Sequence, residues 1–241
     1  HKYYKFLSKS LEKVDGVIVI NSYLNSLHKD CGIERLFLAH DGVNIDEYKD
    51  ISDYDFQPKK QNLRIVYTGS LFLWKGVNTL VDSLSHLPRS CQLIFIGGSG
   101  QYLQNFKRYV KESGNSSRIE IIPHIPKKEL LEFVEQADLL VLPNSAKDKM
   151  SLFTSPIKLF EYMASKRPIV ASSLPSIKEV LIDKKNAILF EPDNHVDLAK
   201  KINLALTEDC KYIVNNAFED VKVYTWDLRA HGIANFIFKS K

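Results

Sequence analysis

Short apolar runs rich in valine, isoleucine and leucine alternate along the chain with longer segments of helical period. Such runs are typical of strands that are buried on both faces of a parallel sheet, because helices cover both faces. The runs lie at residues 15–21, 35–40, 63–69, 91–98, 118–123, 138–143, 167–172 and 186–191. The alternation predicts an α/β protein built from strand-helix-strand units.

A TIM barrel also contains eight parallel strands, and two features of the sequence count against it. Residues 41–62 are polar and contain Pro58, Lys59 and Lys60, as an interdomain linker does. After Glu191 only helical patterns follow, and no strand pattern returns to close a barrel. We therefore expect a doubly wound, Rossmann-like parallel sheet.

The same pattern divides the chain into four predicted segments. Residues 1–45 contain a helix, a strand, a helix and a strand. Residues 46–62 are the interdomain linker, and residues 63–225 form the six-stranded doubly wound domain. Residues 226–241 form a C-terminal helix. The first residue is His1 rather than methionine, so we expect a piece of a longer protein.

Composition excludes several classes of protein. The 241 residues are 44% hydrophobic and 26% charged, which excludes a disordered or collagen-like chain. The net charge of +4 is too small for a nucleic-acid-binding tail, and no nucleic-acid partner is expected. Cys31, Cys91 and Cys210 are scattered and odd in number, which favours a reducing, cytoplasmic setting over a disulfide framework. No apolar run approaches the roughly 18–20 residues needed to cross a bilayer.

The first candidate site follows the strand at residues 63–69. Gly69 is followed by a loop from Ser70 to Gly76 and then by an amphipathic helix. Such a turn places free backbone N–H groups and the positive end of a helix dipole at the carboxyl edge of the sheet, where an anion can bind. Lys75 would add a cation for a phosphate, and Ser70 a hydroxyl donor. An ordinary turn with an exposed lysine is the alternative.

The second candidate is the glycine-rich turn after the strand at residues 91–98. Gly97, Gly98 and Gly100 precede a helix, but a dinucleotide fingerprint would need a further glycine near Tyr102 or Leu103. The sequence therefore disfavours a nicotinamide cofactor. These glycines are expected to let the backbone turn sharply or approach another group closely.

The strongest candidate is the segment SLFTSPIKLFEYMASKRPIVAS at residues 151–172. Ser155 is a good N-cap and Pro156 suits the first helical position, so a helix is expected to begin at Pro156. The N–H groups left unsatisfied there would be those of Ile157, Lys158 and Leu159, and such donors favour a diphosphate. Glu161, nearly two turns into the helix, could accept hydrogen bonds from the vicinal hydroxyls of a ribose. An exposed helix glutamate is the alternative.

In their order and spacing these motifs resemble family 4 of the retaining GT-B glycosyltransferases, the glycosyl transferases group 1. The resemblance rests on Gly69 with Lys75-Gly76, the GGSG loop, ADLLVLPN, SPIKLFEYMASKRPIVAS and NAILFEPDNHVDLAKKI. It covers nearly the whole chain, because DGVIVIN and HDGVNIDEY resemble the end of the family's first domain and the crossing into its second. It implies that residues 1–45 are a remnant of the acceptor-side domain, the tail end of a truncated N-terminal Rossmann domain. It also implies that residues 63–225 bind the nucleotide sugar and that the helix at 226–241 returns towards the N-terminal domain.

The resemblance implies transfer of a sugar, with retention, from a UDP- or GDP-sugar to a glycan, lipid-linked or polysaccharide acceptor, without a metal or other cofactor. Lys75 would bind the donor phosphates and Glu161 the ribose, as the catalytic residues. The residues that would flank the base are His124, Ile125 and Pro126. The other donor-binding residues it implies are Gly69, Ser70, Gly98, Phe153, Thr154, Ser155, Pro156, Ile157 and Lys158.

The chain departs from the family pattern at two positions. Many members have an arginine directly after Gly69, where this chain has Ser70, so that Arg167, Lys158 or another residue would have to supply the second phosphate cation. The family's paired glutamates would need a glutamate at position 153, where the chain has Phe153. These departures leave open a non-catalytic Rossmann-type nucleotide-binding or scaffold subunit that needs a separate chain or the missing domain.

The resemblance also bears on partners and location. We expect a cytoplasmic protein, with peripheral contact at the inner face of the membrane as a further option because many such enzymes use lipid-linked acceptors. The missing domain would hold the acceptor site, so the isolated fragment is expected to be inactive and to expose an apolar face where that domain would sit.

Several conspicuous residues have ordinary structural interpretations. The lysine pairs at residues 127–128, 184–185 and 200–201 are expected on solvated faces. Candidates for stacking or sugar contact, with ordinary packing as the alternative, are Trp74, His124 and Tyr162.

Overall fold

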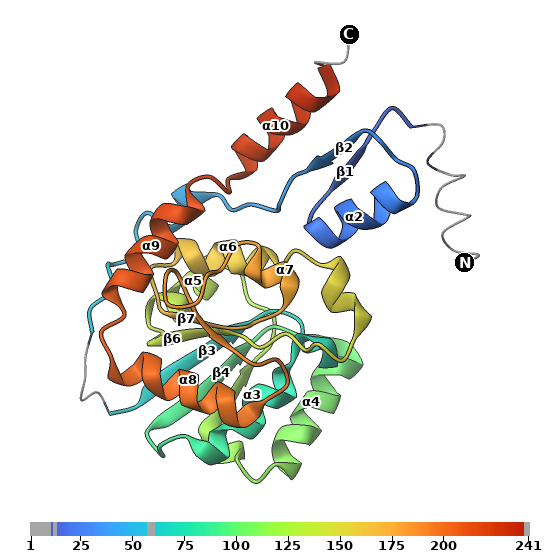
Figure 1. Ribbon diagram of the computed structural model, residues 1–241. Helices are drawn as coiled ribbons and strands as arrows, with labels where there is room; N and C mark the ends of the chain where they lie inside the picture. Colours follow the sequence, from blue (N-terminus) through green and yellow to red (C-terminus); the bar gives the residue numbers. More distant parts are fainter. Residues whose placement is uncertain (1–10, 12–13, 57–60, 239–241) are drawn as a thin grey trace.

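The computed structural model describes residues 11, 14–56 and 61–238 and contains two parallel sheets (Figure 1). The smaller sheet pairs β1 (Val17–Val19) with β2 (Leu36–Leu38), and α2 (Ser22–Asp30) connects them. We call β1, α2 and β2 the N-terminal unit. The helix predicted near the start of the chain falls on positions 1–10 and 12–13, which lie outside the described residues.

The larger sheet has six parallel strands in the order β5-β4-β3-β6-β7-β8. They are β3 (Leu63–Thr68), β4 (Cys91–Ile96), β5 (Ile119–Ile122), β6 (Leu139–Leu142), β7 (Ile169–Ser172) and β8 (Ile188–Phe190). This is the strand order of a doubly wound Rossmann sheet, and because the sheet is open it excludes the TIM barrel. Every predicted run contains one of the observed strands, so the predicted fold class is confirmed.

Helices cover both faces of the larger sheet (Figure 1). On one face lie α3 (Val77–Ser83), α4 (Gly100–Glu112) and α8 (His195–Thr207). On the other lie α5 (Lys127–Glu135), α6 (Ile157–Ala164), α7 (Pro175–Lys178) and α9 (Lys211–Val221). The remaining helical segments are the 3-10 turns η1 (Ile45–Tyr48), η2 (Leu73–Lys75), η3 (Leu84–His86), η4 (Ser116–Arg118), η5 (Lys149–Phe153) and the last helix, α10 (Trp226–Phe238).

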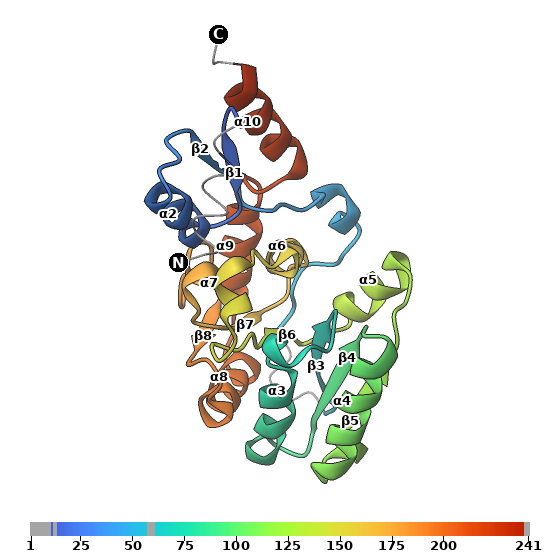
Figure 2. The ribbon, with the colours of Figure 1, turned by 90° about the vertical axis from the view of Figure 1, so that its right-hand side faces the viewer.

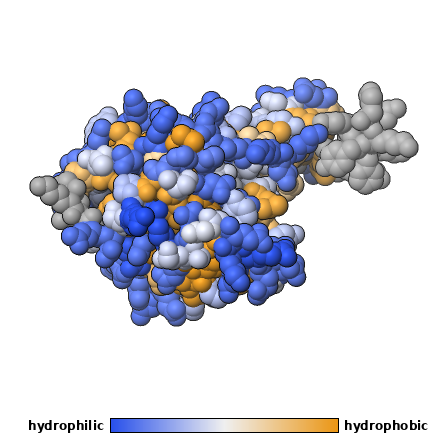
Figure 3. Space-filling view, turned by 90° about the horizontal axis from the view of Figure 1, so that it is seen from below, coloured by the Kyte–Doolittle hydropathy of each residue, from blue (hydrophilic) through white to orange (hydrophobic). Residues whose placement is uncertain are grey.

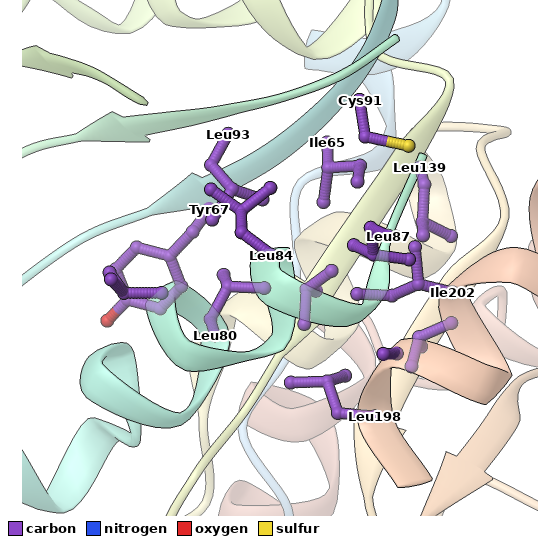
Figure 4. Packing of buried hydrophobic residues seen from close by; sticks show 14 of the residues in the cluster. Ile65, Tyr67, Leu80, Leu84, Leu87, Cys91, Leu93, Leu139, Leu198 and Ile202 are labelled. Atoms are coloured by element: carbon purple, nitrogen blue, oxygen red, sulfur yellow. The ribbon is translucent and has the colours of Figure 1, made fainter. Parts of the chain in front are cut away.

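The core has two layers because neighbouring strand residues point to opposite faces. In β3, Ile65 and Tyr67 face α3 and α8, whereas Val66 faces α6, and all are at most 1% exposed. Figure 4 shows the first layer, in which Leu80 of α3 and Leu198 of α8 approach the strands. Each large apolar side chain buried in this way contributes roughly 1.5–3 kcal/mol.

The second layer fixes the position of α6 against the end of β3. Tyr162 of α6 is fully buried, and its hydroxyl accepts a hydrogen bond of 2.9 Å from the backbone N–H of Thr68. The same hydroxyl lies 3.1 Å from the Thr68 side-chain oxygen. Tyr162 is therefore a packing residue, as its structural interpretation predicted, and it ties α6 to the turn that follows β3.

The last helix leaves the larger sheet and lies beside the N-terminal unit (Figures 1 and 2). The ring of Phe236 in α10 stacks on that of Phe37 in β2, with centroids 5.4 Å apart. Apolar side chains of this part that stay exposed are Val14, Ile18, Leu38, Leu228, Ile237 and Phe238. By contrast, the face seen in Figure 3 is mostly hydrophilic, with apolar residues in small patches.

None of the helices in the described part of the chain is long and apolar enough to span a membrane.

Candidate nucleotide-sugar site

Two cavities open at the carboxyl edge of the larger sheet, where the strand order reverses between β3 and β6. Ligands of doubly wound folds bind at this switch point. The larger cavity has a volume of about 710 Å³, the smaller one about 250 Å³, and Ser70 and Lys158 line both. Of the predicted residues, the larger is lined by Gly69, Ser70, Gly98, His124, Ile125, Lys158 and Glu161. The smaller is lined by Ser70, Lys75, Thr154, Ser155, Pro156, Ile157 and Lys158.

The glycines of the first two turns allow close approach of backbone and side chain. Gly97 has a φ of +124°, and a Cβ there would lie 2.5 Å from the carbonyl oxygen of Gly69. Gly69 has a φ of +118°, and a Cβ there would overlap the ammonium nitrogen of Lys158. Both angles lie in the region that favours glycine. At Gly97 this confirms the prediction that the glycines after the strand at residues 91–98 allow a sharp turn or a close approach.

Lys75 and Lys158 are two cations at the smaller cavity, one from the end of η2 and one from the first turn of α6. Burial and the charge of Lys158 lower the pKa of Lys75 to about 7. Burial lowers the pKa of Lys158 to about 8, against an opposing effect of Glu161. In the part of the chain that the structure describes, neither ammonium forms an ion pair with a carboxylate. Two cations without a counterion favour an anion of more than one charge.

Aromatic rings accompany both lysines. The Lys75 nitrogen lies 3.8 Å from the centroid of the Trp74 ring, and the Lys158 nitrogen lies 5.3 Å from that of Tyr67. Attraction of an ammonium to the face of a ring offsets part of its lost hydration. The Trp74 ring therefore stabilises the charged form of Lys75.

Helix α6 begins one residue later than the sequence predicted. Pro156, with a ψ of 110°, is extended and precedes the first helical residue, and no side chain caps this end, so the prediction of Ser155 as N-cap was wrong. The N–H of Leu159 donates to the carbonyl of Pro156 at 2.8 Å, which also corrects the prediction that it is unsatisfied. Among the described residues, the N–H groups of Ile157 and Lys158 have no protein acceptor. These two N–H groups belong to the first turn of α6, and their residues line the smaller cavity.

Glu161 lines the larger cavity and is held by a residue that the sequence analysis missed. Its carboxylate pairs with the ammonium of Lys127, which also donates to the Tyr48 hydroxyl at 2.9 Å and lies 3.6 Å from Glu47. Lys127 was expected on a solvated face, and its side chain is 38% exposed, but its ammonium also has these partners beside the larger cavity. Burial and the charge of Glu161 raise the pKa of Tyr48.

Two predicted donor residues line neither cavity. Pro126 precedes the first residue of α5, and Phe153 packs edge-on against Tyr23 of α2, with ring centroids 5.4 Å apart. Arg167 does not supply a second phosphate cation. Its guanidinium donates to the backbone carbonyls of Ser52 and Glu135, at 2.9 and 2.7 Å, and so fastens the linker to the larger sheet.

The structure adds lining residues that the sequence did not single out. Phe72 and Tyr102 pack edge-to-face with centroids 4.5 Å apart, and both line the larger cavity. Asn144, which directly follows the predicted strand at residues 138–143, lines the smaller cavity. Within the described residues there is no group of three or more histidine, cysteine, aspartate or glutamate side chains placed to hold a metal ion.

The model of the family described as glycosyl transferases group 1 matches residues 49–220. The chain belongs to the group 1 glycosyl transferases. The matched segment contains both cavities and every strand of the larger sheet, so the group 1 family and the Rossmann-like sheet are assigned to the same residues.

Known proteins agree with this family assignment. An uncharacterized glycosyltransferase of Methanocaldococcus jannaschii is 24% identical over 95% of this chain and 60% of its own length. The O-antigen chain mannosyltransferase RfbU of Salmonella typhimurium is 22% identical over 99% of this chain and 64% of its own length. The chain thus spans less than two thirds of the length of these two relatives.

Among solved structures, Anabaena HepE in complex with UDP and glucose superposes with a TM-score of 0.82 at 17% identity. The superposition covers 100% of this chain and 67% of HepE. It confirms the predicted fold class, including the N-terminal unit, as that of GT-B glycosyltransferases.

Proposed function

We propose that this chain is the donor-binding part of a retaining glycosyltransferase of family 4, which takes a sugar from a UDP- or GDP-sugar. The observation that carries the proposal is the pair Lys75 and Lys158, two partly buried cations without a carboxylate partner among the described residues, at the switch point of a Rossmann sheet. A nucleoside diphosphate offers the multiple negative charge that such a pair requires. The UDP complex of HepE supports the same choice of ligand.

In the proposed complex, the smaller cavity holds the diphosphate and the larger one the nucleoside. Lys75, Lys158 and the N–H groups of Ile157 and Lys158 bind the phosphates. Glu161 accepts hydrogen bonds from the ribose hydroxyls, while one of its oxygens stays paired with Lys127. The base lies in the turns after β4 and β5, near Gly98, His124 and Ile125.

These groups would act by stabilising charge on the leaving group. When the bond from the sugar to the diphosphate breaks, negative charge grows on the phosphate oxygens. Lysines and helix N–H groups that are already in place stabilise this charge without having to reorganise, which lowers the barrier. No protein nucleophile is part of this proposal.

We further propose that turnover needs an acceptor-side domain to which residues 1–45 and the C-terminal segment 226–241, with its helix α10, belong. Both relatives described above are longer than this chain, and apolar side chains stay exposed on the N-terminal unit and α10. The RfbU relative, an O-antigen chain mannosyltransferase, supports a glycan or polysaccharide acceptor, and a lipid-linked acceptor is the other option of this proposal. A cytoplasmic location, with peripheral contact at the inner face of the membrane, would give access to a lipid-linked acceptor.

A thermal-shift panel tests the donor proposal. UDP, GDP, ADP and NAD are compared with buffer, and a ligand at about 100 times its dissociation constant should stabilise the fold by about 2.7 kcal/mol, a shift of several degrees. A shift with UDP or GDP that is lost in Lys75→Ala is expected. A panel in which no nucleotide raises the melting temperature would refute the donor proposal.

The role of Glu161 predicts a loss of discrimination at the ribose. The chain should bind UDP about tenfold more tightly than 2′-deoxy-UDP, because the deoxy compound lacks one hydroxyl that the carboxylate accepts. In Glu161→Ala both ligands should bind with nearly equal, weaker affinity by isothermal titration. Glu129→Ala, on the exposed side of α5, is the matched control and should keep the tenfold ratio. Unchanged discrimination in Glu161→Ala would contradict the assignment.

A non-catalytic nucleotide-binding or scaffold subunit is the second candidate, favoured by Ser70 and by Phe153, which faces the N-terminal unit. Both candidates bind a nucleoside diphosphate. Only the glycosyltransferase should transfer label from a UDP- or GDP-sugar to a glycan or lipid acceptor once the acceptor-side domain is supplied. Donor binding without any transfer under those conditions would favour the scaffold.

A further inference from the structure

The side chain of Asn21, at the end of the predicted strand at residues 15–21, connects the N-terminal unit to the larger sheet. It is 1% exposed, and its carbonyl oxygen accepts from the N–H of Leu24 at 2.9 Å and so caps α2. Its NH₂ group donates to the carbonyl oxygens of Leu152 at 3.1 Å and Thr154 at 3.3 Å. The capping bond and the two carbonyl acceptors fix the orientation of the amide.

Other contacts hold the same surfaces together. The N–H of Ser22 donates to both carboxylate oxygens of Glu179, at 3.0 Å each, and His40 lies 3.6 Å from that carboxylate. Phe153 lies in the sequence between Leu152 and Thr154, whose carbonyls accept hydrogen bonds from Asn21. Its ring packs edge-on against that of Tyr23. Phe153, the departure from the family's glutamate, therefore contributes to this contact instead of to a cavity.

The loop that Asn21 holds leads directly into the smaller cavity. Thr154 and the four residues after it line that cavity, and Lys158 carries both a cation and a free N–H. On its other side the loop is held by the Ser176 hydroxyl, which donates to the carbonyl of Ser151 at 3.2 Å. The position of the loop thus determines where α6 begins and where the two phosphate donors of Ile157 and Lys158 lie.

We infer that Asn21 is a positioning residue for the diphosphate site, so that the N-terminal unit controls the affinity of the larger sheet for its donor. This inference rests on the proposed function. Because coupling between two binding events is reciprocal, the donor should in turn stabilise the contact between Asn21 and the loop.

Two substitutions at Asn21 separate this role from simple helix capping. Asp caps a helix as well as Asn does, but it has no N–H and would turn a carboxylate oxygen towards two carbonyls. If Asn21 only caps α2, Asn21→Asp should bind UDP with wild-type affinity. Asn21→Ala, which loses the cap, should then bind UDP more weakly than Asn21→Asp. If Asn21 positions the loop, Asn21→Asp should bind UDP about tenfold more weakly than the wild type and no better than Asn21→Ala.

The site of the effect is tested with uridine, which lacks the phosphates. Titrations followed by NMR should give unchanged uridine affinity in Asn21→Asp, because the nucleoside lies in the other cavity. Asn25→Asp places the same new charge one turn further along α2 and should leave both affinities unchanged. Equal weakening of UDP and uridine, or wild-type UDP affinity in a folded Asn21→Asp, would overturn the inference.

Hydrogen exchange on the unmodified chain gives a test that does not depend on a variant folding. UDP should slow exchange at the N–H of Leu24, which Asn21 caps, several-fold more than uridine does at equal occupancy. No difference between the two ligands would overturn the inference. A wild-type chain that binds neither GDP nor UDP would instead refute the proposed function.

Discussion

Replacing Lys158 with methionine is expected to weaken UDP binding by about 100-fold. A charge-assisted hydrogen bond in a partly buried site contributes about 1.5–3 kcal/mol, and about 1.4 kcal/mol corresponds to a factor of ten. Methionine keeps most of the length and apolar surface of the lysine stem, so that the charge is the main loss. Isothermal titration of wild type and variant with UDP measures the change.

Two further variants show whether that loss belongs to the phosphate site. Ser70→Arg in the Lys158→Met background should recover about tenfold of the lost affinity, because Ser70 lines the same two cavities as Lys158 and an arginine there would return a cation to the site. Lys128→Met, on an exposed part of α5, should bind UDP like the wild type. Lys158→Met that folds and keeps its affinity would remove Lys158 from the donor site.

The position of Lys158 suits the second phosphate cation that the sequence analysis expected in place of an arginine at position 70. Gly69 leaves open the space into which the Lys158 ammonium extends, since a Cβ at position 69 would occupy that same space. The sequence named both Lys158 and Arg167 as replacements, and only the contacts distinguish them. Arg167 is 6% exposed, and its guanidinium donates hydrogen bonds to carbonyl oxygens of the linker and of α5. Lys158, by contrast, lines both cavities.

The fold was predictable because its signal is local. Strands such as β6, LLVL, are short apolar runs that are buried along their whole length, and each run is visible without knowledge of its neighbours. The ends of elements depend on backbone geometry that several residue types permit. Either Ser155 or Pro156 could precede the first helical residue, and the extended ψ of Pro156 decides between them.

The contacts around the candidate site were less predictable, because they join residues far apart in the chain. Lys127 and Glu161 are 34 positions apart, and neither spacing nor residue type distinguishes Lys127 from its exposed neighbour Lys128. Asn21 and the carbonyl of Thr154 are 133 positions apart. The residue type of Asn21 is typical of a helix cap, and only the packing of the N-terminal unit reveals the two further hydrogen bonds that its NH₂ group donates.

The same lysines that would bind the donor should destabilise the free protein. A cation held without a counterion costs free energy in the folded state, and a lowered pKa measures that cost. Sites of this kind are more stable when the ligand supplies the opposite charge. The pH dependence of the free energy of unfolding should therefore reveal the lowered pKa of Lys75 even in the absence of any nucleotide.

Lys75→Met is expected to raise the free energy of unfolding at pH 7 and to change its dependence on pH. The pKa of Lys75 is about 7 in the folded chain and has its ordinary value of 10.5 when the chain unfolds. Between these values the unfolded chain binds a proton that the folded chain does not, so wild-type stability should rise with pH, by about 2 kcal/mol from pH 7 to 9 from this group. The variant lacks this contribution, so its advantage should be largest at pH 7 and shrink towards pH 9.

Urea unfolding at pH 7, 8 and 9 measures the effect, and Lys200→Met on the exposed side of α8 is the control, whose difference from the wild type should not vary with pH. The range stops at pH 9 because burial raises the pKa of the Cys91 and Cys210 thiols, which makes unfolding easier at higher pH. Methionine also changes packing, but that contribution is the same at every pH. An advantage of Lys75→Met that stays constant across the range would mean that Lys75 is solvated and charged in the free protein, and the affinity for a diphosphate would then rest on Lys158 and the helix N–H groups.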